Sequence, residues 1–371
     1  MRIGFLLPRD DVHHVAHIVP AAISLAELRA DFAVSILTYS FRSAKEVDWL
    51  LPVTSANLHH WRVGRSEELG DRNVLADDRE LLSTLDAVVT TEPDMTRLRR
   101  QHRLGDIPVI YMRPGASDFT AGLDQRVEGF DHILVQGDKI RDRLIETGSV
   151  DGDRVSVIGC PKFDAPPPMP AGMEPADGRP IVLYNPHYSP EVSSWFRWGP
   201  SILNWFADNP DYRLIFAPHV RLFDQKRVRR RGRFLPQRIG RIDPRWLEAP
   251  NIHIDVGSTA SMTRAYTEVA DIYVGDAGGQ LYEFIHRPRP CGFLYPHGLA
   301  AGGVGHERFG WGAGIIIEKT RLFGDLLRTA QEWHEEVHAP VQREMFDYSI
   351  SVTDEPARHR AAMAIAKAVG A

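Results

Sequence analysis

The feature of this sequence that most constrains its fold is a regular alternation of short apolar runs with longer amphipathic stretches. Two of these stretches, residues 15–30 and 139–148, carry the spacing of crossover helices. Apolar runs separated by such helices are typical of strands that are buried on both faces of a parallel sheet. The strands predicted in this part of the chain are residues 2–8, 32–39, 85–91, 108–114, 132–138 and 154–161.

A proline-rich segment interrupts the alternation near the middle of the chain. Residues 165–180 contain six prolines and show no periodicity, which excludes a helix or a central strand there. The alternation then restarts, with helices predicted at 200–209, 262–270 and 279–287 and an irregular loop over the glycine-rich residues 297–314. The second set of predicted strands is 181–187, 213–219, 252–256, 271–276, 290–296 and 314–318.

These patterns predict an α/β protein with two Rossmann-like domains. A chain of 371 residues exceeds the size at which one hydrophobic core usually stops growing. We expect an N-terminal domain over 1–164, a linker over 165–180, a C-terminal domain over 181–345, and final helices over 346–371 that pack back on the first domain. The two domains are expected to face each other across a cleft lined by the loops that follow the strands, because ligands bind there in open α/β sheets.

Composition and charge narrow the class of protein. A formal net charge of -5 weighs against a dedicated nucleic-acid binder. Cys160 and Cys291 lie far apart in the sequence and suit the reduced, buried thiols of a cytoplasmic protein. The N-terminus becomes acidic too early for a signal peptide, and no apolar run of about 18 residues is present. We therefore expect a cytoplasmic protein, either in solution or on a membrane surface.

The turn after the predicted strand at 271–276 carries the strongest ligand-binding signal. A glycine pair in a strand-to-helix turn lets a ligand approach the backbone, and the start of the helix offers N–H groups that suit phosphate or diphosphate. A glutamate four residues later could accept hydrogen bonds from ribose hydroxyls. The alternative is a tight turn in which Asp276 is only the N-cap of the helix. The residues predicted to bind the donor here are Asp276, Gly278, Gly279, Gln280 and Glu283.

Other loops in the second half add candidates. His187 and His219 both follow a proline at a strand end, where imidazoles can hydrogen-bond a diphosphate and offset charge on a departing nucleotide; helix capping or packing is the alternative. Arg221 is a further diphosphate partner, and Ser258 is either a nucleotide contact or a helix cap. Neither the histidine spacing nor another ligand cluster predicts zinc, so no metal or cofactor is expected. The first strand-to-helix turn also lacks G-x-G-x-x-G, which argues against a usual nicotinamide enzyme.

Several segments resemble two enzyme families that share the two-domain GT-B fold. The segment DAGGQLYE at 276–283 is similar to the D-S-G-G-x-x-E-E motif of the UDP-N-acetylglucosamine 2-epimerases. The same region resembles the A-D-x-x-I-T-D-Y-S-S block of the CDP-glycerol glycerophosphotransferases of the teichoic-acid type. Residues 130–164, which end in G-x-P-x-x-D at Asp164, and the segments VLYNPHYSPE and LIFAPHVRL extend the resemblance over roughly residues 80–295. It implies that Gly278 and Gly279 contact the diphosphate, that Glu283 holds the ribose, and that the acceptor binds the N-terminal domain.

The chain departs from both families where a catalytic base would stand. Arg113 replaces the glutamate of the epimerase V-E-A-G segment, and a guanidinium cannot act as a base at neutral pH, which weighs against epimerisation. The glycerophosphotransferases carry a His-Gly pair where this chain has Pro114 and Gly115. His17 is expected to be structural. The base is therefore sought among His13, His14, Asp94 and Asp118.

Residues 225–241, QKRVRRRGRFLPQRIGR, concentrate arginine in an otherwise acidic protein. We predict a loop or a short amphipathic helix. Sparse aromatic residues argue against nucleic acid, and a solvated loop is the plain alternative. We prefer contact with an anionic membrane surface, where each cation contributes about 1 kcal/mol. This contact would place the protein peripherally at the inner face of the cytoplasmic membrane.

Together these features predict a metal-independent transferase. It would move a sugar or glycerol-phosphate group from a UDP- or CDP-linked donor to a hydroxyl of a lipid- or glycan-linked acceptor of the cell envelope. Two alternatives stay open. One is an isomerase or hydrolase of the 2-epimerase kind, for which Asp94 would supply a carboxylate, and the other is a nucleotide-sugar-binding protein without catalysis.

Overall fold

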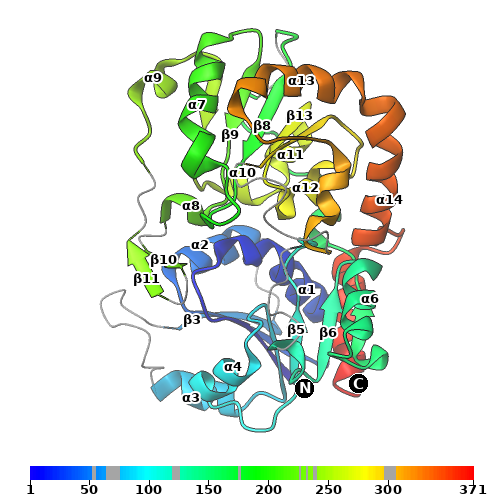
Figure 1. Ribbon diagram of the computed structural model, residues 1–371. Helices are drawn as coiled ribbons and strands as arrows, with labels where there is room; N and C mark the ends of the chain where they lie inside the picture. The colour runs from blue at the N-terminus through cyan, green and yellow to red at the C-terminus, as the bar shows by residue number, and fades with distance from the viewer. Residues whose placement is uncertain are drawn as a thin grey trace. The chain divides into compact units, whose positions relative to one another are not determined.

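The computed structural model describes residues 1–51, 56–63, 76–118, 126–173, 177–224, 227–230, 233–236, 240–295 and 306–371 (Figure 1). By its internal contacts the chain divides into two compact units. The first comprises residues 1–116, 120–165 and 347–371, and the second comprises 117–119 and 166–346. Each unit is built around one parallel sheet with helices.

The first unit contains a seven-stranded parallel sheet in the order β3-β2-β1-β4-β5-β6-β7. Because β1 pairs with β2 on one side and with β4 on the other, the direction of winding reverses there. The strand β3 was not predicted, because only Leu58 of its five residues is buried and no apolar run marks it. The strands are β1 (Arg2–Leu7), β2 (Ala33–Thr38), β3 (Leu58–Arg62), β4 (Ala87–Thr90), β5 (Val109–Met112), β6 (His132–Val135) and β7 (Val155–Val157).

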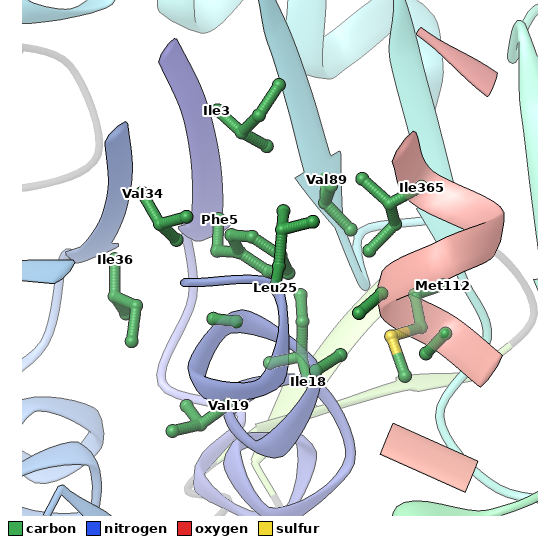
Figure 2. Close-up of a cluster of buried hydrophobic side chains, with 14 of the residues drawn as sticks. Ile3, Phe5, Ile18, Val19, Leu25, Val34, Ile36, Val89, Met112 and Ile365 are labelled. Carbon is green, nitrogen blue, oxygen red and sulfur yellow. The ribbon is translucent and has the colours of Figure 1, made fainter. Parts of the chain in front are cut away.

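Two helices from opposite ends of the chain share the core on one face of this sheet. Figure 2 shows Ile18 of α1 (Val15–Leu28) and Ile365 of α15 (Ala357–Ala368) in one cluster with Phe5 and Met112 of the strands. Full burial of an apolar side chain of this size contributes about 1.5–3 kcal/mol, so the C-terminal helix is an integral part of this core. The other α-helices of the unit with described bounds are α2 (Phe41–Leu50), α3 (Ala76–Ser83), α4 (Met95–His102) and α6 (Asp138–Glu146).

The G-x-P-x-x-D motif attaches the C-terminal helix to the first unit. The carboxylate of Asp164 accepts the backbone N–H groups of Ala357 and Arg358, at 2.7 and 2.8 Å, in the first turn of α15. Gly159 lies against the segment before that helix, in the left-handed region with φ +77°. The motif therefore supplies a remote cap for α15 and the space that the C-terminal segment needs.

The second unit contains a six-stranded parallel sheet in the order β12-β9-β8-β13-β14-β15. If the strands of this sheet are numbered from β8 in chain order, the order is 3-2-1-4-5-6, which is the order of a Rossmann sheet. The direction of winding reverses between β8 and β13. The strands are β8 (Ile181–Asn185), β9 (Arg213–Phe216), β12 (Ile252–Ile254), β13 (Ile272–Gly275), β14 (Cys291–Leu294) and β15 (Ile315–Ile317). The helices are α7 (Trp195–Asp208), α8 (Arg221–Asp224), α9 (Pro244–Glu248), α10 (Thr259–Met262), α11 (Ala265–Val269), α12 (Gly279–Phe284), α13 (Phe323–Glu332) and α14 (Ala339–Ser349).

The prediction for the arginine-rich segment was wrong. It contains an antiparallel hairpin formed by β10 (Arg227–Arg230) and β11 (Arg233–Pro236), not a loop or a helix. Extended backbone is favoured there by Val228 and Phe234, because β-branched and aromatic residues are good strand formers. The proposed membrane contact depends on side chains that lie outside the described residues, so it stays a prediction.

Two smaller predictions also need correction. The helix predicted at 262–270 begins only at Ala265, in α11, because Thr263 is extended and separates it from α10, which ends at Met262. The glycine-rich stretch predicted as an irregular loop forms 3₁₀ turns over His306–Ala313, whereas 296–305 lies outside the described residues. In the described part of the chain no helix is both long and apolar enough to cross a membrane. The thiols of Cys160 and Cys291 are buried and are not joined in a disulfide.

Replacing Gly159 with Ala should destabilise the first unit more than replacing Gly148. Both glycines have a left-handed φ, +77° and +68°, so each substitution costs about 1 kcal/mol in backbone conformation. Only at Gly159 would the new Cβ also meet the side chain of Arg360 and the carbonyl oxygen of Ser351. We expect a loss of about 2–3 kcal/mol for Gly159→Ala in urea unfolding. Equal losses for the two variants would contradict this account of the motif.

Candidate functional site

The reversal of winding between β8 and β13 locates the candidate site. Ligands of open α/β sheets bind at the carboxyl ends of the two strands that flank such a reversal. His187 follows the end of β8, Asp276 follows the end of β13, and His219 follows the end of the neighbouring strand β9. The fold thus brings together three residues that the sequence predicted from separate motifs.

Hydrogen bonds join the three strand-end loops. The side-chain amide of Asn185 donates to the carbonyl of Ala217 at 2.6 Å, and its oxygen accepts from the Tyr273 hydroxyl at 3.3 Å. The backbone N–H of His219 donates to the carbonyl of Pro186 at 3.0 Å. Asn185 was not predicted, although an amide at the last position of an apolar strand is a signal of this role. The bonds hold both histidine backbones in fixed places.

Both histidines have the same tautomer. The Nδ1 atom of His187 accepts the backbone N–H of Ser189 at 3.0 Å, and Nδ1 of His219 accepts that of Arg221 at 3.2 Å. A neutral imidazole that accepts at Nδ1 carries its proton on Nε2. The ring centroids lie 5.6 Å apart. Two Nε2–H donors are therefore held side by side at the end of the sheet.

The positive charge of this cluster belongs to Arg221. Burial, with a smaller contribution from the Arg221 guanidinium, lowers the pKa of His187 to about 4, so this imidazole is neutral at pH 7. The guanidinium lies over the ring of Tyr188, 5.3 Å from its centroid. Tyr188 also stacks on His187 and contacts His219, with centroids 4.4 and 4.6 Å away. The arrangement combines neutral donors with one cation, which suits an anion.

Asp276 lies behind the cluster. The residue is only 1% exposed. Its carboxylate accepts the backbone N–H of His187 at 2.7 Å and that of Ser194 at 3.0 Å. Burial raises the pKa of Asp276 to about 7, against the smaller effects of the Ser194 hydroxyl and of these backbone N–H groups. The alternative that Asp276 caps α12 was wrong, because Gly278 is the N-cap residue.

The turn before α12 is closely packed at Gly275 and has space beside it at Gly278. Ala277 is in the left-handed region, with φ +54°, which is uncommon for a residue with a side chain. Among the residues that the structure describes, a Cβ added to Gly278 would meet no atom within 4 Å, whereas one on Gly275 would lie 2.7 Å from the carbonyl oxygen of Asn185. The backbone at Gly278 thus borders open space beside the histidine loops.

Of three other residues predicted to contact the donor, two hydrogen-bond within the protein and the third is buried. The Gln280 amide donates to the carbonyl of Ser261 at 2.8 Å. Ser258 caps α10 and hydrogen-bonds the carboxylate of Asp255 through its hydroxyl and, at 2.8 Å, its backbone N–H. Glu283 is buried in α12. Nucleotide contacts of these residues stay predictions, and Asp255, which the sequence analysis missed, organises the end of β12.

Asp118, a predicted base, is anchored in the second unit. It is 4% exposed, and its two carboxylate oxygens accept from the Tyr282 hydroxyl at 2.7 and 2.6 Å. The backbone N–H of Gly310 donates to the same carboxylate at 2.8 Å. These bonds connect Asp118 to Tyr282 of α12 and to Gly310 and favour a structural role, and a catalytic role of Asp118 stays a prediction.

The first unit has its own strand-end cluster where β1 and β4 flank the reversal of winding. Nδ1 of His14 hydrogen-bonds the Thr91 hydroxyl at 3.1 Å, and the His13 ring packs edge-on against that of His14. Asp94 caps α4 by accepting the backbone N–H of Arg97 at 2.9 Å. His17 is buried in α1, and burial holds its pKa well below the usual range. Whether His13, His14 or Asp94 is the base stays a prediction.

Glu92 is a carboxylate that the sequence analysis missed. It follows β4, is 5% exposed, and forms an ion pair with Arg9 from the end of β1. It also accepts the backbone N–H of Asp94 at 3.2 Å. Burial raises the pKa of Glu92 even though the Arg9 charge opposes this shift. The only signal in the sequence was its position in a strand-end loop.

Residues 334–338 spell H-E-x-x-H, which on an α-helix is the pattern of a zinc site. Here they form a π-helical turn, in which His334 hydrogen-bonds the carbonyl of Pro288 and His338 that of Gly312. Within the ranges that the structure describes, no group of three His, Cys, Asp or Glu side chains could hold a metal ion. The two histidines tie the turn to neighbouring loops.

Comparison with solved structures identifies the architecture as the GT-B fold. Three similar structures each match 99% of this chain. The wall teichoic acid polymerase TagF soaked with CDPG is 12% identical, with 88% of its own chain covered and a TM-score of 0.65. The UDP-GlcNAc 2-epimerase from Neisseria meningitidis bound to UDP-GlcNAc is 12% identical, with 98% covered and a TM-score of 0.57, and the glycotransferase of kitacinnamycin is 15% identical, with 98% covered and a TM-score of 0.54. No protein-family model and no curated protein matches the sequence. The predicted α/β class and its GT-B type are confirmed.

Replacing Arg221 with Gln should raise the pKa of His187, because one of the two causes of its depression is removed. Burial remains, so the pKa should stay below the ordinary value of about 6.5. NMR titration of the His187 imidazole measures the change. Arg213→Gln is the matched control, because Arg213 begins β9 at the opposite edge of the sheet. An identical titration in the Arg221 variant and the parent would show that the guanidinium does not act on this ring.

Proposed function

We propose that the second unit binds the diphosphate of a nucleotide-activated donor at the ends of β8, β9 and β13. We propose further that the protein transfers the sugar or glycerol-phosphate group of that donor to an acceptor hydroxyl. The observation that carries the proposal is the pair of Nε2–H donors on His187 and His219 beside the Arg221 guanidinium and the open Gly278 turn. The likeness in fold to structures that contain UDP-GlcNAc or CDPG supports the same ligand class.

The chemistry of donor cleavage requires stabilisation of negative charge on the departing nucleotide. Hydrogen-bond donors that are already oriented provide this stabilisation without reorganisation during the reaction. Nε2–H of a neutral imidazole donates without needing to titrate, and Arg221 supplies a permanent charge. We infer that these groups, together with backbone N–H groups near Gly278, replace a metal ion in this role.

Activation of the acceptor hydroxyl requires a base, which we place at the ends of β1 and β4 in the first unit. His14 and Glu92 are the groups that best fit, because Asp94 already caps a helix. A carboxyl with a raised pKa lies closer to the operating pH and is better suited to proton transfer. The acceptor is proposed to be a lipid- or glycan-linked hydroxyl of the cell envelope.

One observation favours a second candidate function. Epimerases of the UDP-N-acetylglucosamine kind need carboxylates in the N-terminal domain, and Glu92 supplies one that the sequence analysis had not counted. The products separate the alternatives when UDP- and CDP-linked donors are incubated with an acceptor. Released nucleoside diphosphate indicates glycosyl transfer, released nucleoside monophosphate indicates glycerophosphate transfer, and an isomerised donor indicates epimerisation.

Replacing His187 with Ala should weaken the binding of UDP or CDP at least about tenfold. A hydrogen bond to a charged group contributes about 1.5–3 kcal/mol, and tenfold corresponds to about 1.4 kcal/mol. His187→Gln, whose side-chain amide can donate near the position of Nε2, should retain part of the affinity. Calorimetry measures both variants against His338→Ala, in which the lost imidazole bonds the carbonyl of Gly312 instead. The proposal fails if the unaltered protein binds no nucleotide.

A further inference from the structure

Asp276 lies in the motif that the sequence assigned to the ligand, yet its carboxylate is directed into the protein. Both oxygens accept backbone N–H groups, and the residue is 1% exposed. We propose that Asp276 is a positioning residue that holds the segment 187–194 against the end of β13 and so places His187, without touching the donor itself. The consequence for ligand binding rests on the proposed function above.

The geometry of the segment explains why one carboxylate can control it. Asp276 bonds His187 at its first residue and Ser194 at its last, so it joins two points that are seven residues apart. Inside the segment, the backbone N–H groups of Val192 and Ser193 both donate to the carbonyl of Ser189, which closes only a local turn. Ser194 also precedes α7, so the same carboxylate anchors the start of that helix.

The carboxylate is held without a cation. Among the described residues Asp276 forms no ion pair, and the titratable groups that face it are the Tyr184 hydroxyl from β8 and the Tyr273 hydroxyl from β13, both with pKa values raised well above the usual range. The His187 imidazole is neutral, and the Arg221 guanidinium lies beside it. The negative charge of Glu283 in α12 contributes to the raised pKa of Tyr273. A carboxyl whose pKa is raised to about 7 is mostly neutral below that pH, which limits its repulsion of a diphosphate there.

Linkage gives the sign of the pH dependence. The pKa of Asp276 is about 7 when the segment covers it, compared with about 4 for an aspartate in water. Closing the segment therefore takes up a proton between these two values. The closed form is favoured below about pH 4, is weakened progressively as pH rises from about 4 to 7, and changes little above that. Because a protonated carboxyl keeps acceptor lone pairs, it still bonds the two N–H groups.

Hydrogen exchange of the full-length protein without ligand tests the positioning role. In Asp276→Ala both acceptors are lost, and we expect amides of 187–194 to exchange at least about tenfold faster, whereas strand β9 exchanges as before and reports an intact fold. Asp271→Ala is the matched control, since Asp271 lies at the opposite end of β13 and accepts the backbone N–H of Ile181 at 2.8 Å. This control should leave 187–194 unchanged. Equal exchange in the Asp276 variant and the parent would overturn the proposal.

A second measurement on the unaltered protein covers the case in which the Asp276 variant does not fold. Protection factors of 187–194 should fall as pH rises from about 5 to 7, and affinity for UDP or CDP should fall in parallel. A pH-independent protection factor would overturn the proposal, and so would faster exchange in Asp276→Ala with unaltered nucleotide affinity. If the unaltered protein bound neither UDP nor CDP, the proposed function would fall, while the exchange data would still decide the positioning role.

Discussion

Parallel pairing of β8 with β9 on one side and β13 on the other is the constraint on which the second unit depends. Parallel strands bring all their carboxyl ends to one edge, and the reversal of winding sends the following chain in two directions. The polar groups of that edge must be satisfied by the loops themselves. Asn185 and Asp276 meet this need, and the bonds that they make also place His187 and His219.

The acidic residues show how a requirement of the fold can occupy groups that resemble catalytic ones. Asp94 caps a helix, Asp118 binds Tyr282 of α12 and the backbone of Gly310, and Asp276 binds the ends of a loop. Each accepts a backbone N–H, which a carboxylate does well near a helix start or a turn. Glu92 differs because its main partner is a side-chain cation, Arg9, and burial still raises its pKa. It is thus the acid of the first unit with the clearest case for chemistry.

Motifs that resemble those of known enzymes therefore divide into two kinds. The G-x-P-x-x-D ending at Asp164 serves the fold, because it caps α15 and admits the C-terminal segment beside Gly159. The two Pro-His pairs and the glycine turn remain the candidates for ligand binding, since they follow β8, β9 and β13 at or beside the reversal of winding, and no described atom fills the space next to Gly278. Similarity of short motifs does not separate these roles, and the partners of each side chain do.

The sequence by itself was sufficient for the α/β class, two parallel sheets and most strands, because buried strands and crossover helices impose different periods on apolar residues. It did not reveal β3 or the β10–β11 hairpin, which lack such runs. Candidate residues such as His187 and Asp276 could be named from motifs, but their roles depend on partners about 90 positions away along the chain. The shared tautomer of the histidines, the raised pKa of Asp276 and the Glu92–Arg9 pair came only from the folded chain, because burial and hydrogen bonding between distant segments produce them.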